Sequence, residues 1–188
     1  MITLRKAQIH EYDAVRSFYH RLIDMMEDAV YKPAWEKDVY PANQYMKDAI
    51  AAEQLYVGFL KDNHSADGYA GTSTAEDIIC AMVINNECND SYADADWQID
   101  ALPEEVTVIH TLGVLPSHFG KGIATEMVHF VIDGAKAAGQ KAVRLDVLAG
   151  NLPAERLYSD VGFKHITTIP MFYEDTGWTD FLLYEYLL

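Results

Sequence analysis

Apolar and polar positions along the chain alternate with two different periods, one typical of strands and one typical of helices. Short runs rich in apolar residues predict strands at residues 2–9, 55–60, 78–85, 106–114, 143–149, 163–169 and 181–188. Apolar residues at helical spacing predict helices at residues 12–30, 42–54, 123–139 and 152–162. Strands and helices interspersed in this way predict an α/β (α+β) fold with one mixed central sheet of about seven strands and about four flanking helices.

Three connecting segments stand out between these elements. Residues 31–45 contain two prolines, which interrupt helices, and four aromatic residues. Residues 61–77 are rich in turn-forming residues, and residues 85–105 form a long acidic connection. The chain shows no internal repeat or linker, and 188 residues suit one well-filled core. We therefore expect a single domain over residues 1–188.

The acidic charge of the chain narrows the classes of partner. Aspartate and glutamate outnumber lysine and arginine by 29 to 14, for a net charge of −15, which argues against a nucleic-acid partner. The charge serves solubility, or it attracts a cationic substrate such as an amine. No apolar run has the length of a membrane span, no signal peptide is visible, and the two cysteines form no metal or disulfide pattern. A cytoplasmic protein without a membrane partner or a metal is expected.

The stretch SHFGKGIAT, residues 117–125, places two glycines between an apolar run and a predicted helix. A glycine loop before a helix presents free backbone N–H groups and the positive end of the helix dipole to an anion. The stretch does not match a P-loop, because Gly122 follows Lys121 where a hydroxyl is required. It does not match the dinucleotide fingerprint either, because Thr125 replaces the third glycine. On its own, the loop fits a phosphate site or a plain turn.

Two stretches in this order, HTLGVLPSHFGKGIATEMV and VRLDVLAGNLPAERLYSDVGFKHI, resemble the Gcn5-related N-acetyltransferase (GNAT) superfamily. The resemblance is strongest over residues 106–166, and the strand and helix order of the remainder is compatible with it. It implies the acyl-CoA N-acyltransferase fold and transfer of an acetyl group from acetyl-CoA to an amine. It is also compatible with a homodimer.

The resemblance implies where acetyl-CoA binds. The family pattern [QR]-x-x-G-x-[GA] falls on residues 119–124, where Phe119 departs from the usual glutamine or arginine. The backbones of Leu112 and Val114 match the strand positions that bond the pantetheine arm, and the Val114 N–H is the candidate oxyanion donor. Together, the expected cofactor-binding residues are Leu112, Val114, Phe119, Gly120, Lys121, Gly122, Ile123, Ala124, Thr125, Asn151 and Ala154.

The resemblance also assigns the candidate catalytic residues. Tyr158 matches the tyrosine that protonates the departing coenzyme A thiolate, a suitable task for a phenol with a pKa near 10. His110 matches a catalytic histidine of the aralkylamine acetyltransferases, and strand alternation places it on the same face as Leu112. As alternatives, His110 is a buried core histidine, and Glu104 or Glu105 acts as a base through water. Gly113 is expected to ease a local bulge in this strand.

Acceptor specificity is expected to come from the segments outside the family motifs. Tyr31 and Trp35 are candidates for an aromatic wall around an amine, with Tyr40 and Glu36 nearby, although such aromatics also simply pin loops to a core. Three functions stay open. The first is an N-acetyltransferase that acts on a small cationic amine by direct attack within a ternary complex. The others are a protein N-terminal or lysine acetyltransferase and a non-catalytic acyl-CoA-binding module.

Overall fold

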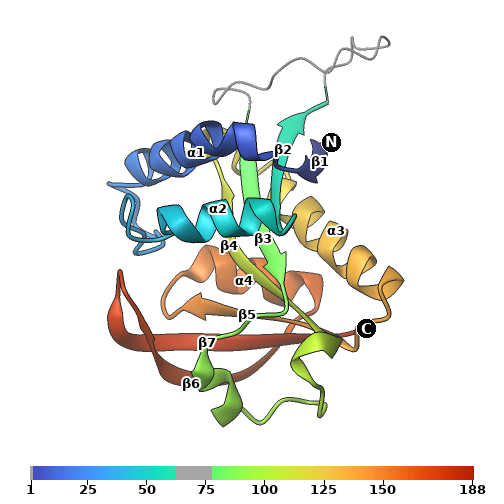
Figure 1. The fold of residues 1–188 in the computed structure, drawn as a ribbon. Helices are drawn as coiled ribbons and strands as arrows, with labels where there is room; N and C mark the ends of the chain where they lie inside the picture. Colours follow the sequence, from blue (N-terminus) through green and yellow to red (C-terminus); the bar gives the residue numbers. More distant parts are fainter. Residues whose placement is uncertain (1, 62–77) are drawn as a thin grey trace.

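A computed structural model describes residues 2–61 and 78–188, so the turn-rich segment expected at 61–77 lies almost wholly outside the described residues. Seven strands form one sheet in the order β1-β2-β3-β4-β5-β7-β6 (Figure 1). The strands are β1 (Ile2–Lys6), β2 (Leu55–Leu60), β3 (Cys80–Asn85), β4 (Val106–Val114), β5 (Ala142–Leu148), β6 (Lys164–Tyr173) and β7 (Gly177–Leu187). The α-helices of the described part are α1 (Tyr12–Met25), α2 (Asn43–Ala51), α3 (Ile123–Ala137) and α4 (Leu152–Val161). The expected mixed sheet with flanking helices is confirmed.

The sheet lies between two layers of helices. Ala81 and Val83 of β3 belong to the apolar cluster of α1 and α2, whereas Cys80 and Met82 belong to the cluster of α3 and α4. Successive side chains of a strand point to opposite faces of the sheet, so each residue of this apolar run is buried under one helix layer or the other. α1 and α2 lie together over one face of the sheet (Figure 1). None of the helices in the described residues has the length and hydrophobicity of a membrane span.

Helix α3 packs one face against the sheet and leaves Phe130 at its edge. Ile123, Met127 and Val131 are buried, but Phe130 is 38 % exposed and packs edge-on against Tyr56 at 5.4 Å. The buried stripe also includes residues 128, 132 and 135, and it is therefore centred away from Phe130. Phe130 closes the edge of the core and does not fill it.

The last two strands are longer than the apolar runs that predict them. Residues 170–180 were expected to connect two strands, yet pairing continues from Pro170 with Asp180 to Tyr173 with Gly177. Only a short turn at residues 174–176 remains between the strands. Pro170 is tolerated because β6 is an edge strand, where a missing N–H costs no central hydrogen bond. The resulting β6–β7 hairpin places its tip close to the loop between α1 and α2.

The acidic connection, residues 85–105, is folded onto the sheet and contains two short 3-10 helices, η2 (Asp90–Asp94) and η3 (Pro103–Glu105). A buried ion pair holds its middle: Glu185 Oε1 accepts from Arg144 Nε at 2.9 Å. Glu185 Oε2 accepts from the Gln98 backbone N–H at 2.8 Å, and the Arg144 guanidinium lies 4.2 Å from the Trp97 ring centroid. The connection is therefore an ordered part of the fold, fixed in place by charge.

Candidate active site

A gap between β4 and β5 forms the centre of the site. The two strands run parallel and pair only from Val106 with Ala142 to Val108 with Arg144. Beyond this point two hollows meet, an apolar groove of about 470 Å³ and a smaller, more enclosed cavity of about 120 Å³. The hollows share five lining residues, Pro33, Trp35, Leu112, Asn151 and Ala154. A ligand in the groove therefore reaches a ligand in the cavity between the two strands.

The glycine loop lies at one end of the groove. Gly120 and Gly122 have φ angles of 71° and 74°, in the left-handed region that favours glycine, and Gly122 is the N-cap of α3. A Cβ added at either position would meet nothing within 4 Å, so open space lies above this backbone. The first N–H groups of α3, at Ile123, Ala124 and Thr125, have no acceptor within the helix. This geometry fits a phosphate group.

Two side chains of the loop differ in how they meet the groove. Phe119 lines the groove and is 53 % exposed, so it offers an apolar surface where the family pattern has a polar side chain. The Lys121 ammonium donates to the Ser117 carbonyl at 3.1 Å and closes the loop on itself. The backbone of the loop is thus the main feature available to an anion, and the binding roles of both side chains stay predictions.

The end of β4 contains a bulge, but not at the expected glycine. Ala81 pairs with Gly113 and Val83 with His110, so β4 has one residue more than β3 in this interval. Thr111, with a φ of 49°, occupies the bulge, and the Tyr19 hydroxyl lies 3.1 Å from its carbonyl oxygen. The bulge also interrupts the alternation expected for His110 and Leu112, although both line the cavity.

Gly113 packs closely against helix α1. A Cβ at this position would come 2.5 Å from Leu22 Cδ2 of α1. Leu115, the residue directly after β4, donates its N–H to the carbonyl of Ile79, the residue directly before β3. Because N–H directions alternate along an antiparallel strand, the Val114 N–H lies on the other edge of β4, toward the gap. This direction agrees with the expected roles of the Leu112 and Val114 backbones.

Tyr158, on α4, lines the cavity. Its side chain is buried, with the ring 5.5 Å from the Phe163 ring, and within the described residues its hydroxyl has no hydrogen-bond partner. Burial, together with the charge of Asp146, raises the pKa of Tyr158 above its ordinary value. The hydroxyl is therefore protonated at neutral pH, as a proton donor must be, and it belongs to a side chain that lines the cavity.

His110 is constrained on one ring nitrogen. Nε2 lies 2.8 Å from Asn85 Oδ1 and 3.1 Å from the Glu87 carbonyl oxygen. Asn85 Oδ1 also accepts from the Glu87 N–H at 3.0 Å, so both neighbours of Nε2 are acceptors and the proton resides on Nε2. Burial lowers the pKa of His110 to about 4. Its role as a general base stays a prediction, and this neutral, weakly basic state does not favour it.

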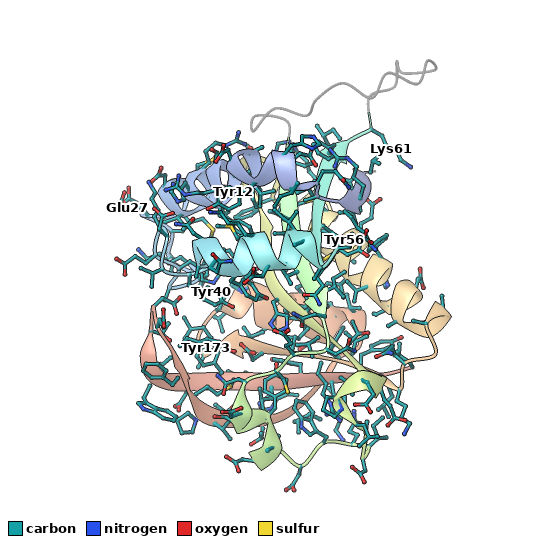
Figure 2. The ribbon with its side chains drawn as sticks, viewed as in Figure 1. Tyr12, Glu27, Tyr40, Tyr56, Lys61 and Tyr173 are labelled. Carbon is teal, nitrogen blue, oxygen red and sulfur yellow. The ribbon has the colours of Figure 1, made fainter. Side chains whose placement is uncertain are left out.

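Aromatic side chains wall the cavity. Ring contacts link Trp35 to Tyr40 at 6.2 Å in a tilted arrangement. Edge-on contacts continue from Tyr40 to Tyr173 at 5.7 Å and from Tyr173 to Phe181 at 5.0 Å. Tyr40 comes from the loop after α1 and Tyr173 from β6, and Figure 2 shows both near the same edge of the molecule. Trp35 lines both hollows, whereas Tyr31 lines only the groove and is 43 % exposed. Of the two predicted acceptor residues, the structure therefore brings only Trp35 to the cavity.

Charged side chains of α1 position the aromatic loop. Arg16 donates to both carboxylate oxygens of Asp38 at 2.7 Å, and His20 Nε2 lies 3.0 Å from Asp38 Oδ1. The Tyr12 hydroxyl donates to Asn43 Oδ1 at 2.8 Å, at the far end of the loop. Bidentate arginine–carboxylate pairs fix orientation as well as distance. The loop is thus held over the cavity by α1.

Asp146 is the acidic residue of the cavity that the family motifs do not indicate. The hydroxyls of Tyr92 and Tyr173 donate to its Oδ2 atom at 2.9 and 3.0 Å. Burial raises the pKa of Asp146, although the two hydroxyl hydrogen bonds act in the opposite direction. A charged residue within the apolar strand run VRLDVLA was the available signal for this position.

The alternative bases lie elsewhere. Glu105 accepts from Lys141 Nζ at 2.7 Å and from the Leu102 N–H at 3.0 Å, and neither Glu104 nor Glu105 lines the cavity. Cys80 and Cys88 also lie outside both hollows. No cluster of three or more His, Cys, Asp or Glu side chains in residues 2–61 and 78–188 is arranged to hold a metal ion.

Comparison with curated proteins gives short matches. An uncharacterised N-acetyltransferase of Methanocaldococcus jannaschii is 34 % identical over 71 residues, which make up 38 % of this chain and 31 % of that protein. An uncharacterised protein of Mycobacterium leprae is 32 % identical over 75 residues, 40 % of this chain and 20 % of that protein. The matched part of the chain thus spans less than a third of the length of either relative.

Comparison with solved structures covers the whole chain. A GNAT-family acetyltransferase of Streptococcus agalactiae 2603 has a TM-score of 0.76 at 15 % identity, with 100 % of this chain and 95 % of that chain covered. Arabidopsis thaliana NAA60, solved with acetyl-CoA, has a TM-score of 0.65 at 18 % identity, with 100 % and 99 % covered. At these identities the likeness shows a shared fold. The Acetyltransferase (GNAT) family profile matches residues 22–163, which is most of the length of this chain, and the chain therefore belongs to the GNAT family.

Proposed function

We propose that the protein is an N-acetyltransferase that moves an acetyl group from acetyl-CoA to the primary amine of a small cationic molecule. The observation that carries this proposal is the small cavity of about 120 Å³, walled by aromatic rings, that opens on the cofactor groove between β4 and β5. A cavity of this small size admits the end of a short amine and leaves little room for a bulkier acceptor group. Aromatic faces and a carboxylate both favour a cation.

Residues of this chain fit acetyl-CoA along the groove. The N–H groups of the glycine loop and of the start of α3 bind the pyrophosphate, and the gap-facing backbone of Leu112 and Val114 bonds the pantetheine arm. Asn151 is the N-cap of α4, but its side chain makes no capping bond and lines both hollows, so it is available to the ligand. Ala154 leaves space beside it. When bound there, acetyl-CoA supplies the acetyl thioester.

The remaining chemistry belongs to side chains of the cavity. The acceptor amine attacks directly within a ternary complex, because neither cysteine reaches the hollows to form a covalent intermediate. The Val114 N–H stabilises the developing oxyanion. Tyr158 gives its proton to the departing thiolate, a role that its free, protonated hydroxyl supports.

The experiment is an acetyl-CoA turnover assay, which follows release of the free thiol across polyamines, aralkylamines, aminoglycosides, amino acids and peptides. The proposal expects turnover with small amines and a strong decline as the acceptor outgrows the cavity. Turnover with peptides alone would identify a protein acetyltransferase and refute the small-amine proposal. Tight acetyl-CoA binding by calorimetry without transfer to any acceptor would identify a binding module.

A further inference from the structure

The carboxylate of Asp146 borders the gap between β4 and β5. At its position β5 pairs only with β7, through Leu183, because pairing with β4 ends at Arg144. Both tyrosine hydroxyls donate to the same oxygen, Oδ2, and no described residue donates to Oδ1. Since Asp146 lines the cavity, its second oxygen is available to a ligand.

No cation within the described residues neutralises this carboxylate. Seven ionisable groups surround it, one from each neighbouring segment. In chain order they are Tyr40 (the loop after α1), Tyr45 (α2), Tyr92 (η2), His110 (β4), Tyr158 (α4), Tyr173 (β6) and Asp175 (the hairpin turn). All of them are neutral or acidic at neutral pH, and no lysine or arginine lines the cavity. Arg144, two residues earlier on β5, is bound to Glu185. A largely shielded carboxylate without a protein cation attracts a cation from outside.

Asp146 also has an oxygen atom open to a ligand proton, whereas the other titratable groups of the cavity are constrained or lie in the hairpin turn. The Nε2 atom of His110 carries its proton toward Asn85 and the Glu87 carbonyl, and burial lowers the pKa of His110 to about 4. Asp175 lies in the hairpin turn at the rim, beside the charge of Glu36. Burial raises the pKa of Asp146, which makes its carboxylate a stronger base than an exposed one.

We propose that Asp146 is the catalytic base, which takes a proton from the acceptor ammonium through its free Oδ1 atom. This proposal rests on the proposed function and names the group that activates the amine. An alkylammonium with a pKa near 10.4 is neutral in only about one molecule in a thousand at pH 7, so its proton must be removed before attack.

The proton balance closes with two protein groups. Asp146 takes the first ammonium proton, and the neutral nitrogen then forms the C–N bond as the thioester C–S bond breaks. Tyr158 protonates the leaving sulfur and regains a proton from the nitrogen, which becomes the amide. Asp146 finally releases its proton to solvent. One ammonium and one thioester thus give one amide, one thiol and one free proton, with no oxidant or metal.

The test compares wild type with Asp146→Asn on the best amine found in the turnover panel. The side chain keeps its size and still accepts from the two tyrosines, but it cannot take a proton. We expect kcat/KM for the amine to fall by about 10²- to 10⁴-fold, mainly through kcat. The dissociation constant for acetyl-CoA, measured by calorimetry, should not change. Asp160→Asn, on the exposed side of α4, is the matched control and should behave as wild type.

A second acceptor separates proton removal from simple charge attraction. An analogue of the same amine with three fluorines on the β-carbon has a pKa below neutrality, so it is mostly neutral at pH 7 and needs no base. With this analogue, the loss of kcat/KM in Asp146→Asn should largely disappear. With the ordinary amine, the fall in rate that wild type shows at acidic pH should be absent from the pH profile of the variant. A variant that raises KM for the amine and leaves kcat and the pH profile intact would overturn the proposal and make Asp146 an anchor.

A stability measurement gives a readout without turnover. A carboxyl group whose folded pKa is raised contributes stability while protonated, and this contribution is lost as the pH rises through its folded pKa. Asp146→Asn should therefore be more stable than wild type at pH 7, and the difference should shrink as the pH falls toward 4. A less stable variant at pH 7 would contradict the unpaired, buried carboxylate. If wild type acetylates no amine, the proposed function itself fails, whereas an active wild type with an equally active variant refutes only the base.

Discussion

The buried pair of Arg144 and Glu185 gives the most direct test of how the acidic connection is held. The Glu185 side chain is completely inaccessible, and the Arg144 side chain is only 10 % exposed. Glu185→Leu removes the acceptor of the Arg144 Nε and of the Gln98 N–H, and it leaves a buried guanidinium without its counter-charge. Breaking a buried pair from one side typically costs about 3–5 kcal/mol.

This magnitude follows from what stays behind in the variant. Arg144 keeps its bond to the Ile99 carbonyl and its position over Trp97, so the loss should lie near the lower end of that range, about 3 kcal/mol. For a domain of this size, 1 kcal/mol lowers Tm by roughly 2–4 °C, and we expect a decrease of roughly 6–12 °C. Urea unfolding at pH 7 measures the free energy, and calorimetry measures Tm.

Two companion variants define the result that would refute this reasoning. The double variant Arg144→Met/Glu185→Leu carries no unpaired charge and should recover part of the lost stability. Glu53→Gln removes one partner of an exposed ion pair with Lys6, which solvent and salt screen, so it should change the stability little. If Glu185→Leu were no more harmful than Glu53→Gln, the buried pair would not hold the connection.

Three further predictions address packing, catalysis and pH. Gly113→Ala brings a Cβ 2.5 Å from a buried leucine and should cost about 1–3 kcal/mol in urea unfolding, whereas Gly134→Ala, in open space on α3, should stabilise by up to about 1 kcal/mol. Tyr158→Phe should lower kcat by about 10²-fold or more in the thiol-release assay, with unchanged acetyl-CoA affinity by calorimetry. Arg5 hydrogen-bonds to Glu11 and lowers the pKa of that carboxyl. The stabilisation that the ionised Glu11 gives the folded protein is therefore present above the unfolded pKa of about 4.3, and it is lost as the pH falls through the folded pKa. Urea unfolding between pH 7 and 2 should show a shallower acid loss for Glu11→Gln.

The sequence predicts the elements of the fold where the apolar period is strong. The strand run at 106–114 and the helix that follows Gly122 both begin and end close to their expected bounds. The apolar pattern does not predict strand residues that are held mainly by backbone hydrogen bonds to a neighbouring strand. Residues 170–180 alternate weakly, yet they extend the β6–β7 hairpin because each strand supplies the other with backbone partners.

In the candidate site, too, local features could be predicted from the sequence and contacts between distant residues could not. The glycine loop, Tyr158 and the β4 backbone are local features, and a motif with fixed spacing is enough to predict them. The bulge at Thr111 depends on Tyr19, which is 92 residues away in sequence, and Gly113 is small because of Leu22 on α1. Contacts between such distant residues leave no local pattern, so the right feature was expected at the wrong residue.

The acidic connection shows why net charge alone does not indicate a site. The net charge is compatible with attraction of a cationic substrate, and this connection carries part of it. In the structure the connection also has another effect: Tyr92 of η2 donates to Asp146 at 2.9 Å. The carboxylate that faces the cavity comes from an apolar strand, where a single acidic residue carries more information than many on the surface. Because Arg144 and Glu185 hold the connection, loss of that pair should also disturb Tyr92, and with it the orientation of Asp146. The stability of the connection and the chemistry of the cavity are therefore coupled through one tyrosine.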